Sequence, residues 1–177
     1  KRPGMYIGST GVDGRHRLIW EIIDNAIDEI ASGYADSLTC TLTKDGAIRV
    51  EDNGRGIPVE IHPEEGKPTV EVVLTVLHAG GKFDNNAYKT SGGLHGVGAS
   101  VTNALSKYMK VWVVRNNIEY YIDFIDGGKL NTPLKKLGNV EKIQGTTVEF
   151  FPDFTVMEKC PFEHDKIVSR LKKLAYL

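Results

Sequence analysis

The sequence predicts an α+β fold: a two-layer sandwich in which helices cover one face of a mixed, mostly antiparallel sheet. Two observations carry this prediction. A long amphipathic helix precedes a strand hairpin, and a later run of alternating segments ends in a closing amphipathic helix. Strands joined by tight turns pair antiparallel. An antiparallel sheet can bury one face against helices while its other face meets water.

The helical pattern is strongest over residues 16–32, where isoleucine and alanine recur at spacings of three and four. Gly33 supplies the stop at its C-terminal end. Weaker helical patterns cover residues 69–77 and 96–105, and a closing amphipathic helix is predicted over residues 164–177. The polar, glycine-flanked segment 82–91 has no period and is predicted to be a loop.

The strand patterns fall into two groups. Segments 36–43 and 47–52 flank Lys44-Asp45-Gly46, which is typical of a hairpin turn. A second group consists of segments 110–115, 119–125 and 146–151, and Asn116-Asn117 forms a tight turn between the first two of these. The result is a sheet assembled from an early hairpin and a later meander.

Composition limits the class of protein. The 177 residues suit one domain, and the net charge of -1 excludes a broadly basic nucleic-acid-binding surface. No apolar run reaches the ~18 residues of a membrane span, and no basic-then-apolar start indicates a secretory signal. Cys40 and Cys160 form no CxxC pair, which argues against a disulfide framework or a zinc site and predicts a reducing cytoplasm.

The first helix carries a polar line opposite its apolar stripe. Glu21, Asn25 and Asp28 are spaced by four and three positions, so they share one side of the helix. Such a line is often only a solvated outer face. Asn is a weak helix former, however, and a carboxylate one turn from an amide can hold a hydrated cation and orient a water molecule.

The end of the second strand carries the pattern Asp52-x-Gly54-x-Gly56. An ordinary turn would explain it, because Asp, Asn and Gly are common turn formers. Alternatively, the glycines let a flat ligand approach the backbone while the Asp52 carboxylate accepts a hydrogen bond from an exocyclic amine, which selects adenine over guanine. Arg55 either covers that ligand or pairs with Glu29.

Residues 91–98, SGGLHGVG, open the next helix and predict a phosphate site built from backbone N–H groups. No apolar strand precedes them, which argues against a Rossmann fingerprint, and no Gly-Lys-Ser/Thr, H-R-D or D-F-G motif is present. Two weaker glycine features are residues 79–82, a candidate lid hinge, and Gly145-Thr146-Thr147, which would bring a hydroxyl to the base pocket. Each of these is more simply an ordinary turn.

Together, segments 21–29, 52–58, 77–83, 91–98 and 145–146 resemble the motifs of the GHKL ATPases, the superfamily that joins gyrase, a heat-shock chaperone, histidine kinases and MutL. Segments 2–8, 62–66 and 78–83 are narrower and resemble the ATPase subunits of the bacterial type IIA topoisomerases, DNA gyrase and topoisomerase IV. The similarity covers nearly the whole chain.

The resemblance implies a Bergerat-type ATP-binding fold that uses ATP and Mg²⁺. Glu21 matches the general base, Asn25 the Mg²⁺ ligand, and Asp52 the acceptor for the adenine amino group, supported by Thr146. Other implied nucleotide contacts are Gly56, Ile57, Lys82, Tyr88, Gly93, Leu94, His95, Gly96, Val97, Gly98 and Ala99. The implied inhibitor rim comprises Asp28, Glu29, Arg55, Pro58 and Arg115. Family members often carry a His one turn before the base, where this chain has Arg17.

The resemblance also implies a nucleotide-driven dimerisation gate that powers DNA strand passage, either supercoiling or decatenation. Its implied partners are ATP, aminocoumarin-type ATP-site inhibitors, a cleavage subunit (gyrase A or topoisomerase IV A), and DNA through other domains only. We expect residues 1–177 to be an N-terminal ATPase domain without its N-terminal arm, transducer and TOPRIM domains. The isolated domain is then expected to be monomeric and to hydrolyse ATP slowly or not at all, whereas the full subunit dimerises on ATP binding.

Two alternatives stay open from the sequence. The first is another GHKL ATPase, such as a MutL-like mismatch-repair protein or a histidine-kinase catalytic domain. The second is a binding module without enzymatic activity, in which the glycines serve only the fold.

Overall fold

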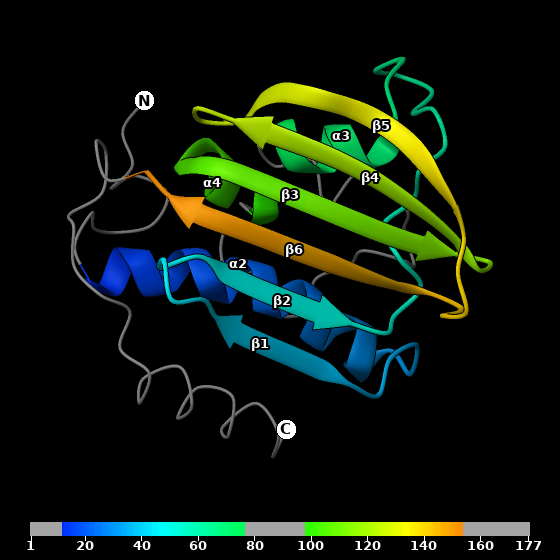
Figure 1. Ribbon diagram of the computed structural model, residues 1–177, viewed down its shortest axis with the longest axis horizontal. Coiled ribbons are helices and arrows are strands. Elements are labelled where there is room, and N and C mark those ends of the chain that lie inside the picture. The colour runs from blue at the N-terminus through cyan, green and yellow to red at the C-terminus, as the bar shows by residue number, and fades with distance from the viewer. Residues whose placement is uncertain (1–11, 77–97, 154–177) are drawn as a thin grey trace.

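The computed structural model describes residues 12–76 and 98–153, and within them the predicted two-layer α+β architecture is confirmed (Figure 1). A six-stranded sheet forms one layer, and the described helices all lie on the same side of it. None of the described helices is long and apolar enough to span a bilayer. The predicted loop at 82–91 and closing helix at 164–177 lie outside the described residues.

The sheet has the strand order β1-β2-β6-β3-β4-β5. The strands are β1 (Leu38–Leu42), β2 (Ile48–Asp52), β3 (Ser106–Arg115), β4 (Ile118–Ile125), β5 (Lys129–Asn139) and β6 (Gly145–Pro152). Every pairing between these strands is antiparallel, so the described sheet lacks the parallel component that a mixed sheet would have. The late strand β6 lies between β2 and β3 and so joins the early hairpin to the meander.

In the described residues, the helix layer consists of α2 (Val12–Ala31), α3 (Thr69–Thr75) and α4 (Gly98–Ala104). Helix α2 begins before the predicted start at residue 16 and ends as predicted, with Gly33 in the left-handed region at φ 82°. Its apolar stripe is fully buried against the sheet and the neighbouring helices. The side chains of this stripe are Leu18, Ile19, Ile22, Ile23 and Ala26.

Helix α4 is tied to both other helices by buried polar side chains. The Thr102 hydroxyl donates to the Leu18 carbonyl of α2 at 3.0 Å, and the Asn103 amide donates to the Leu74 carbonyl of α3 at 2.9 Å. Both donors are essentially inaccessible to water, so these bonds position α4 within the layer.

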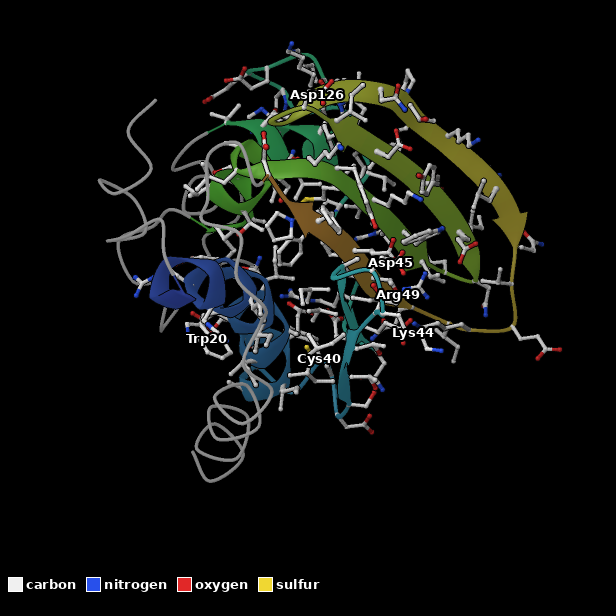
Figure 2. The ribbon with its side chains drawn as sticks, turned by 60° about the vertical axis from the view of Figure 1, so that its left-hand side comes forward. Trp20, Cys40, Lys44, Asp45, Arg49 and Asp126 are labelled. Carbon is white, nitrogen blue, oxygen red and sulfur yellow. The ribbon has the colours of Figure 1, made fainter. Side chains whose placement is uncertain are left out.

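The two predicted turns are confirmed. Asn116 and Asn117 both have positive φ, 51° and 64°, which is the conformation of a tight two-residue hairpin. Figure 2 shows Lys44 and Asp45 at the tip of the β1–β2 hairpin.

Strand β5 was not predicted. It is an edge strand of eleven residues that carries Pro133, Lys135 and Lys136, and its pairing with β4 has several register shifts. Charged residues, proline and irregular pairing protect a sheet edge from further pairing, and the same features hide the strand from sequence patterns.

Buried and exposed side chains alternate along β6, so substitutions there can test which face of the sheet packs against the core. Phe150 is fully buried, whereas Phe151 lies on the face away from the described helices, called the helix-free face below, and stacks on Tyr108 at 5.9 Å between ring centroids. We expect Phe150→Ala to lower the free energy of unfolding by about 3–5 kcal/mol because it leaves a cavity. The matched Phe151→Ala change should cost about 1–2 kcal/mol. Urea titration of both variants measures the difference, and equal losses would contradict the assigned faces.

Candidate functional site

A pocket opens between the helix layer and the part of the sheet formed by β2 and β6. Its wall is formed by residues from the three described helices, two strands and the loop after β2. These residues are Ile22, Asn25, Glu29, Val50, Asp52, Gly56, Ile57, Leu74, Ala99, Thr146 and Val148. Segments far apart in the sequence therefore meet at one cavity, as the motif analysis predicted for the polar helix line, the strand end and the helix start.

Asp52 stands at the end of β2 and pairs in register with Thr146 of β6. Its carboxylate accepts a hydrogen bond from the Gly54 N–H at 2.8 Å. Burial raises the pKa of Asp52 to about 6, and the Glu29 charge adds to the rise, while the Gly54 N–H and Lys142 oppose it. The pocket thus contains a poorly hydrated hydrogen-bond acceptor. In such surroundings a hydrogen bond from a ligand donor is stronger than in water.

The hydroxyl of Thr146 lies in the same wall and accepts a hydrogen bond from the Ile57 N–H at 3.2 Å. Of the two interpretations left open for Gly145-Thr146-Thr147, an ordinary turn or a hydroxyl donor to the pocket, the structure places the Thr146 hydroxyl at the pocket. The same bond holds the loop after β2 against β6 and so fixes Ile57 as part of the wall.

The polar line on α2 is not a solvated face. Glu21 is only 3% exposed, Asn25 and Asp28 are half-buried, and Asn25 lines the pocket. Burial raises the pKa of Glu21, the nearby Arg17 guanidinium lowers it, and the charge of Asp24 raises it. A hydrogen bond from the Gly98 backbone N–H also lowers this pKa, so the start of α4 directly contacts the acid of α2.

Of the two roles considered for Arg55, the structure supports pairing with Glu29. The Glu29 carboxylate accepts from the Arg55 backbone N–H at 2.9 Å and from its guanidinium at 2.7 and 3.2 Å. The guanidinium also lies 3.7 Å above the Tyr34 ring. This cluster links the end of α2 to the loop after β2 at one side of the pocket.

The two glycines of the Asp52-x-Gly54-x-Gly56 pattern make room for protein atoms. A Cβ at Gly54 would lie 2.7–2.9 Å from the Glu29 side chain, and one at Gly56 would lie 2.8 Å from the Val114 carbonyl. Gly56 also has a φ of 81°, which disfavours any other residue. The absent side chains therefore let the loop pack closely against α2 and β3.

Arg115 extends from the end of β3 across this loop. It donates to the Gly56 carbonyl at 2.7 Å and lies 3.9 Å from the Glu60 carboxylate. Pro58 is half-buried in the same loop. Arg55 and Arg115 thus contact the lining residues Glu29 and Gly56, and Pro58 follows the lining residue Ile57, although none of the three lines the pocket itself.

Much of the predicted phosphate segment lies outside the described residues. This applies to Lys82, Tyr88, Gly93, Leu94, His95, Gly96 and Val97, and to the hinge proposed at residues 79–82. Gly98 and Ala99 are described, and Ala99 lines the pocket at the start of α4.

Four apolar residues of the pocket wall were not predicted as site residues. They are Ile22, Val50, Leu74 and Val148. Strand alternation could have indicated two of them, because Val50 lies two residues before Asp52 and Val148 two residues after Thr146, on the same face. A flat apolar ligand portion would contact these side chains while polar atoms meet Asp52 and Thr146.

Comparison with known proteins identifies relatives over the whole chain. The family described as histidine kinase-, DNA gyrase B-, and HSP90-like ATPase matches residues 11–156. The DNA gyrase B protein of Mycoplasma genitalium is 61% identical over 177 residues, and the DNA topoisomerase 4 B protein of Enterococcus faecalis is 54% identical. Both matches cover 100% of this chain but only 27% and 26% of those proteins, so the chain spans about a quarter of their length.

A solved structure agrees with the fold. The 43K ATPase domain of Thermus thermophilus gyrase B, in complex with an aminocoumarin, superposes with a TM-score of 0.86 at 45% identity. The match covers 99% of this chain and 44% of that one.

The raised pKa of Asp52 predicts a pH-dependent stability. Between the ordinary value of 3.8 and the folded value of about 6, the folded protein holds a proton that the unfolded chain has lost. The stabilisation that Asp52 contributes is therefore fully present below pH 3.8 and is lost as the pH rises through about 6. This loss lowers the free energy of unfolding by about 2–3 kcal/mol. Asp52→Asn should abolish this loss in urea titrations from pH 4.5 to 7.5. Glu51→Gln, on the same strand and half-exposed, should keep it; identical pH profiles of Asp52→Asn and the wild type would contradict the assignment.

Proposed function

This chain belongs to the histidine kinase-, DNA gyrase B- and HSP90-like ATPase family, and from that premise we propose that it is the ATP-binding and ATP-hydrolysing domain of a type IIA DNA topoisomerase. The observation that carries the proposal is the meeting of Asn25, Asp52 and Ala99 in one pocket, with Glu21 bonded to the Gly98 N–H beside it. A hydrolytic ATP site needs these parts together: a base-recognition group, an oxygen ligand, backbone donors and a proton acceptor.

Asp52 is proposed to recognise adenine. Its carboxylate accepts a hydrogen bond from the exocyclic amine, and the Thr146 hydroxyl supports the same edge of the base. Ile22, Val50 and Val148 then contact the ring faces and exclude water. Guanine presents a carbonyl oxygen where adenine presents the amine, so it would place an acceptor against an acceptor.

Asn25 is the proposed Mg²⁺ ligand. Among residues 12–76 and 98–153, no three His, Cys, Asp or Glu side chains gather into a metal cage. Mg²⁺ commonly takes only one or two protein oxygens and completes its shell with phosphate oxygens and water, so an amide oxygen in the pocket wall fits that ion. When bound, the ion supplies charge neutralisation at the phosphates.

Glu21 is the proposed general base. Water attack forms a bond to the γ-phosphorus as the water proton passes to the Glu21 carboxylate. The bond between the γ-phosphorus and its bridging oxygen breaks, and the electron pair leaves with ADP. The raised pKa of Glu21 brings its proton affinity closer to neutral pH, where a general base works best. The segment of residues 93–99, including His95, is the proposed phosphate cradle, and Lys82 and Tyr88 are the proposed lid contacts.

The relatives matched over the full chain favour a topoisomerase over a MutL-like protein, because they are gyrase B and topoisomerase IV B proteins. The proposal extends to the whole protein: ATP-driven dimerisation, gyrase A or topoisomerase IV A as the cleavage partner, DNA contact through other domains, and a cytoplasmic location. The aminocoumarin complex of the Thermus domain supports binding of that inhibitor class here. Its proposed location is the rim formed by Asp28, Glu29, Arg55, Pro58 and Arg115.

A ligand titration of the 177-residue chain tests nucleotide binding. ATP with Mg²⁺, or an aminocoumarin, at about 100 times its Kd should add about 2.7 kcal/mol to the free energy of unfolding. GTP at the same concentration should add much less. Asp52→Asn should abolish most of the ATP response, because its amide can present a donor to the adenine amine, while Glu51→Gln should preserve it. A flat thermal-shift response of the wild type would favour a module that binds no nucleotide.

Hydrolysis is tested separately in the full-length protein. Glu21→Gln keeps the size and hydrogen-bonding capacity of the side chain but removes its basicity, so ATP binding should persist while kcat falls by about 10²–10⁴-fold. Glu149→Gln, on the helix-free face of the sheet, is the control and should leave kcat unchanged. Loss of ATP binding in Glu21→Gln would assign this residue a structural role instead.

A further inference from the structure

Lys142 lies in the segment of residues 140–144 that joins β5 to β6. The residue is exposed, but its side chain folds back over Gly145. A Cβ placed on Gly145 would lie 2.8 Å from Lys142 Nζ and 2.5 Å from the backbone carbonyl oxygen of Asp52. The ammonium group is therefore close to the end of β2, where Asp52 lines the pocket. Because ordering a lysine side chain costs rotamer entropy, an attraction has to offset that cost.

Hydrogen bonds at and after Lys142 fix the position of its backbone. The side-chain amide of Asn117 donates to the Lys142 carbonyl at 3.2 Å. Two residues later, the side-chain amide of Gln144 donates to the carbonyls of Tyr34 and Asn53, both at 3.2 Å. Tyr34 follows α2, and Asn53 follows β2. The segment is thus tied to the ends of both elements that carry the acids of the pocket, and Lys142 starts from a defined place beside them.

The charges around Asp52 leave its carboxyl group close to protonation at neutral pH. Burial raises its pKa to about 6, and the negative charge of Glu29 adds to the rise. Glu29 is itself paired with Arg55 at 2.7 Å, so the Arg55 guanidinium is already directed at another acid. Lys142 supplies a positive charge that lowers the pKa of Asp52 and favours its ionised form.

The strands that flank Asp52 do not supply its counter-charge. Strand β6 presents the Thr146 hydroxyl, and on the core side β1 carries Cys40, whose thiol has a pKa raised to about 11 by burial. Asp36, which precedes β1, accepts a hydrogen bond at 2.6 Å from a side-chain amide of the loop after β2. Among residues 12–76 and 98–153, no carboxylate oxygen lies within ion-pair distance of the Lys142 ammonium. A surface ion pair therefore does not explain the fold-back, whereas the attraction to Asp52 does.

We propose that Lys142 is a positioning residue for nucleotide recognition: its ammonium group, folded over Gly145, keeps the Asp52 carboxylate ionised at neutral pH and so sets the pH range over which adenine binds. The inference rests on the proposed function, because it takes Asp52 as the acceptor for the adenine amine. An ionised carboxylate only accepts hydrogen bonds, whereas a protonated carboxyl also donates one, which opposes a donor on the ligand. Lys142 acts through its charge and does not itself line the pocket.

The test measures the Kd of ADP with Mg²⁺ for the 177-residue chain from pH 5.5 to 8.5, and urea unfolding without nucleotide over the same range. Titration of the ADP phosphates affects every variant alike, so the variants are compared at each pH. Lys142→Met removes the charge but keeps an unbranched side chain, and Lys142→Arg keeps the charge. The matched control is Lys44→Met, an exposed lysine at the tip of the β1–β2 hairpin, at the other end of β2 from Asp52 (Figure 2). Asp52→Asn and the double variant with Lys142→Met complete the set.

We expect Lys142→Met to weaken ADP binding by about two- to fivefold at pH 6 and to leave it unchanged at pH 8.5, where Asp52 is ionised in every variant. The pH at which the folded protein loses stability should rise by about 0.5–1 pH unit, because Asp52 then keeps its proton to higher pH. Lys142→Arg should retain both wild-type profiles, and Lys44→Met should not alter them. In the Asp52→Asn background, Lys142→Met should leave the pH profile of unfolding unchanged, because Lys142 acts through Asp52.

Three results would overturn the inference. Wild-type profiles for Lys142→Met, in a protein that binds ADP, would leave the proposed function intact and remove Lys142 from it. An equal loss of affinity at every pH would make Lys142 a direct nucleotide contact. Loss of folding in both Lys142→Met and Lys142→Arg would make its role structural. Failure of the wild type to bind ADP at any pH would instead contradict the proposed function itself.

Discussion

The desolvation of three carboxyl groups, those of Glu21 and Glu29 on α2 and of Asp52 at the end of β2, is the constraint on which the rest of the structure depends. Glu21 and Glu29 come from α2 and Asp52 from β2, and each has a partner that offsets the loss of water. Arg17 and the Gly98 N–H serve Glu21, Arg55 serves Glu29, and the Gly54 N–H serves Asp52. An unpaired charge at any of these positions would cost several kcal/mol, so the loops that supply the partners are held in place by the acids.

The same constraint gives the pocket its chemistry. Partners offset the desolvation only in part, so the pKa of Asp52 rises to about 6 and that of Glu21 also rises. In surroundings of low polarity, the proposed acceptor Asp52 and the proposed base Glu21 would interact with a ligand more strongly than they would in water. The tightly packed Gly54 and Gly56 keep the loop close enough for this environment to persist.

Helix α4 connects the pocket to the segment that precedes it in the chain. Thr102 and Asn103 bond α4 to α2 and α3, while its first residue, Gly98, donates to Glu21. This places the proposed base and the proposed phosphate cradle in direct contact.

The sequence by itself determined the order of the described elements other than β5, the hairpin at Lys44-Asp45-Gly46, the Asn116-Asn117 turn and the residue types of the site, because periodicity and turn chemistry are local properties. Only the tertiary structure decided that Glu21 is buried, since a helical period tells which residues share a face but not what covers that face. Strand β5 likewise became visible only through its pairing with β4, because its charged and proline-containing edge lacks an alternating pattern. Arg55 pairs with Glu29, and β6 lies beside β2, through contacts between residues far apart in the chain. No local sequence pattern encodes such contacts.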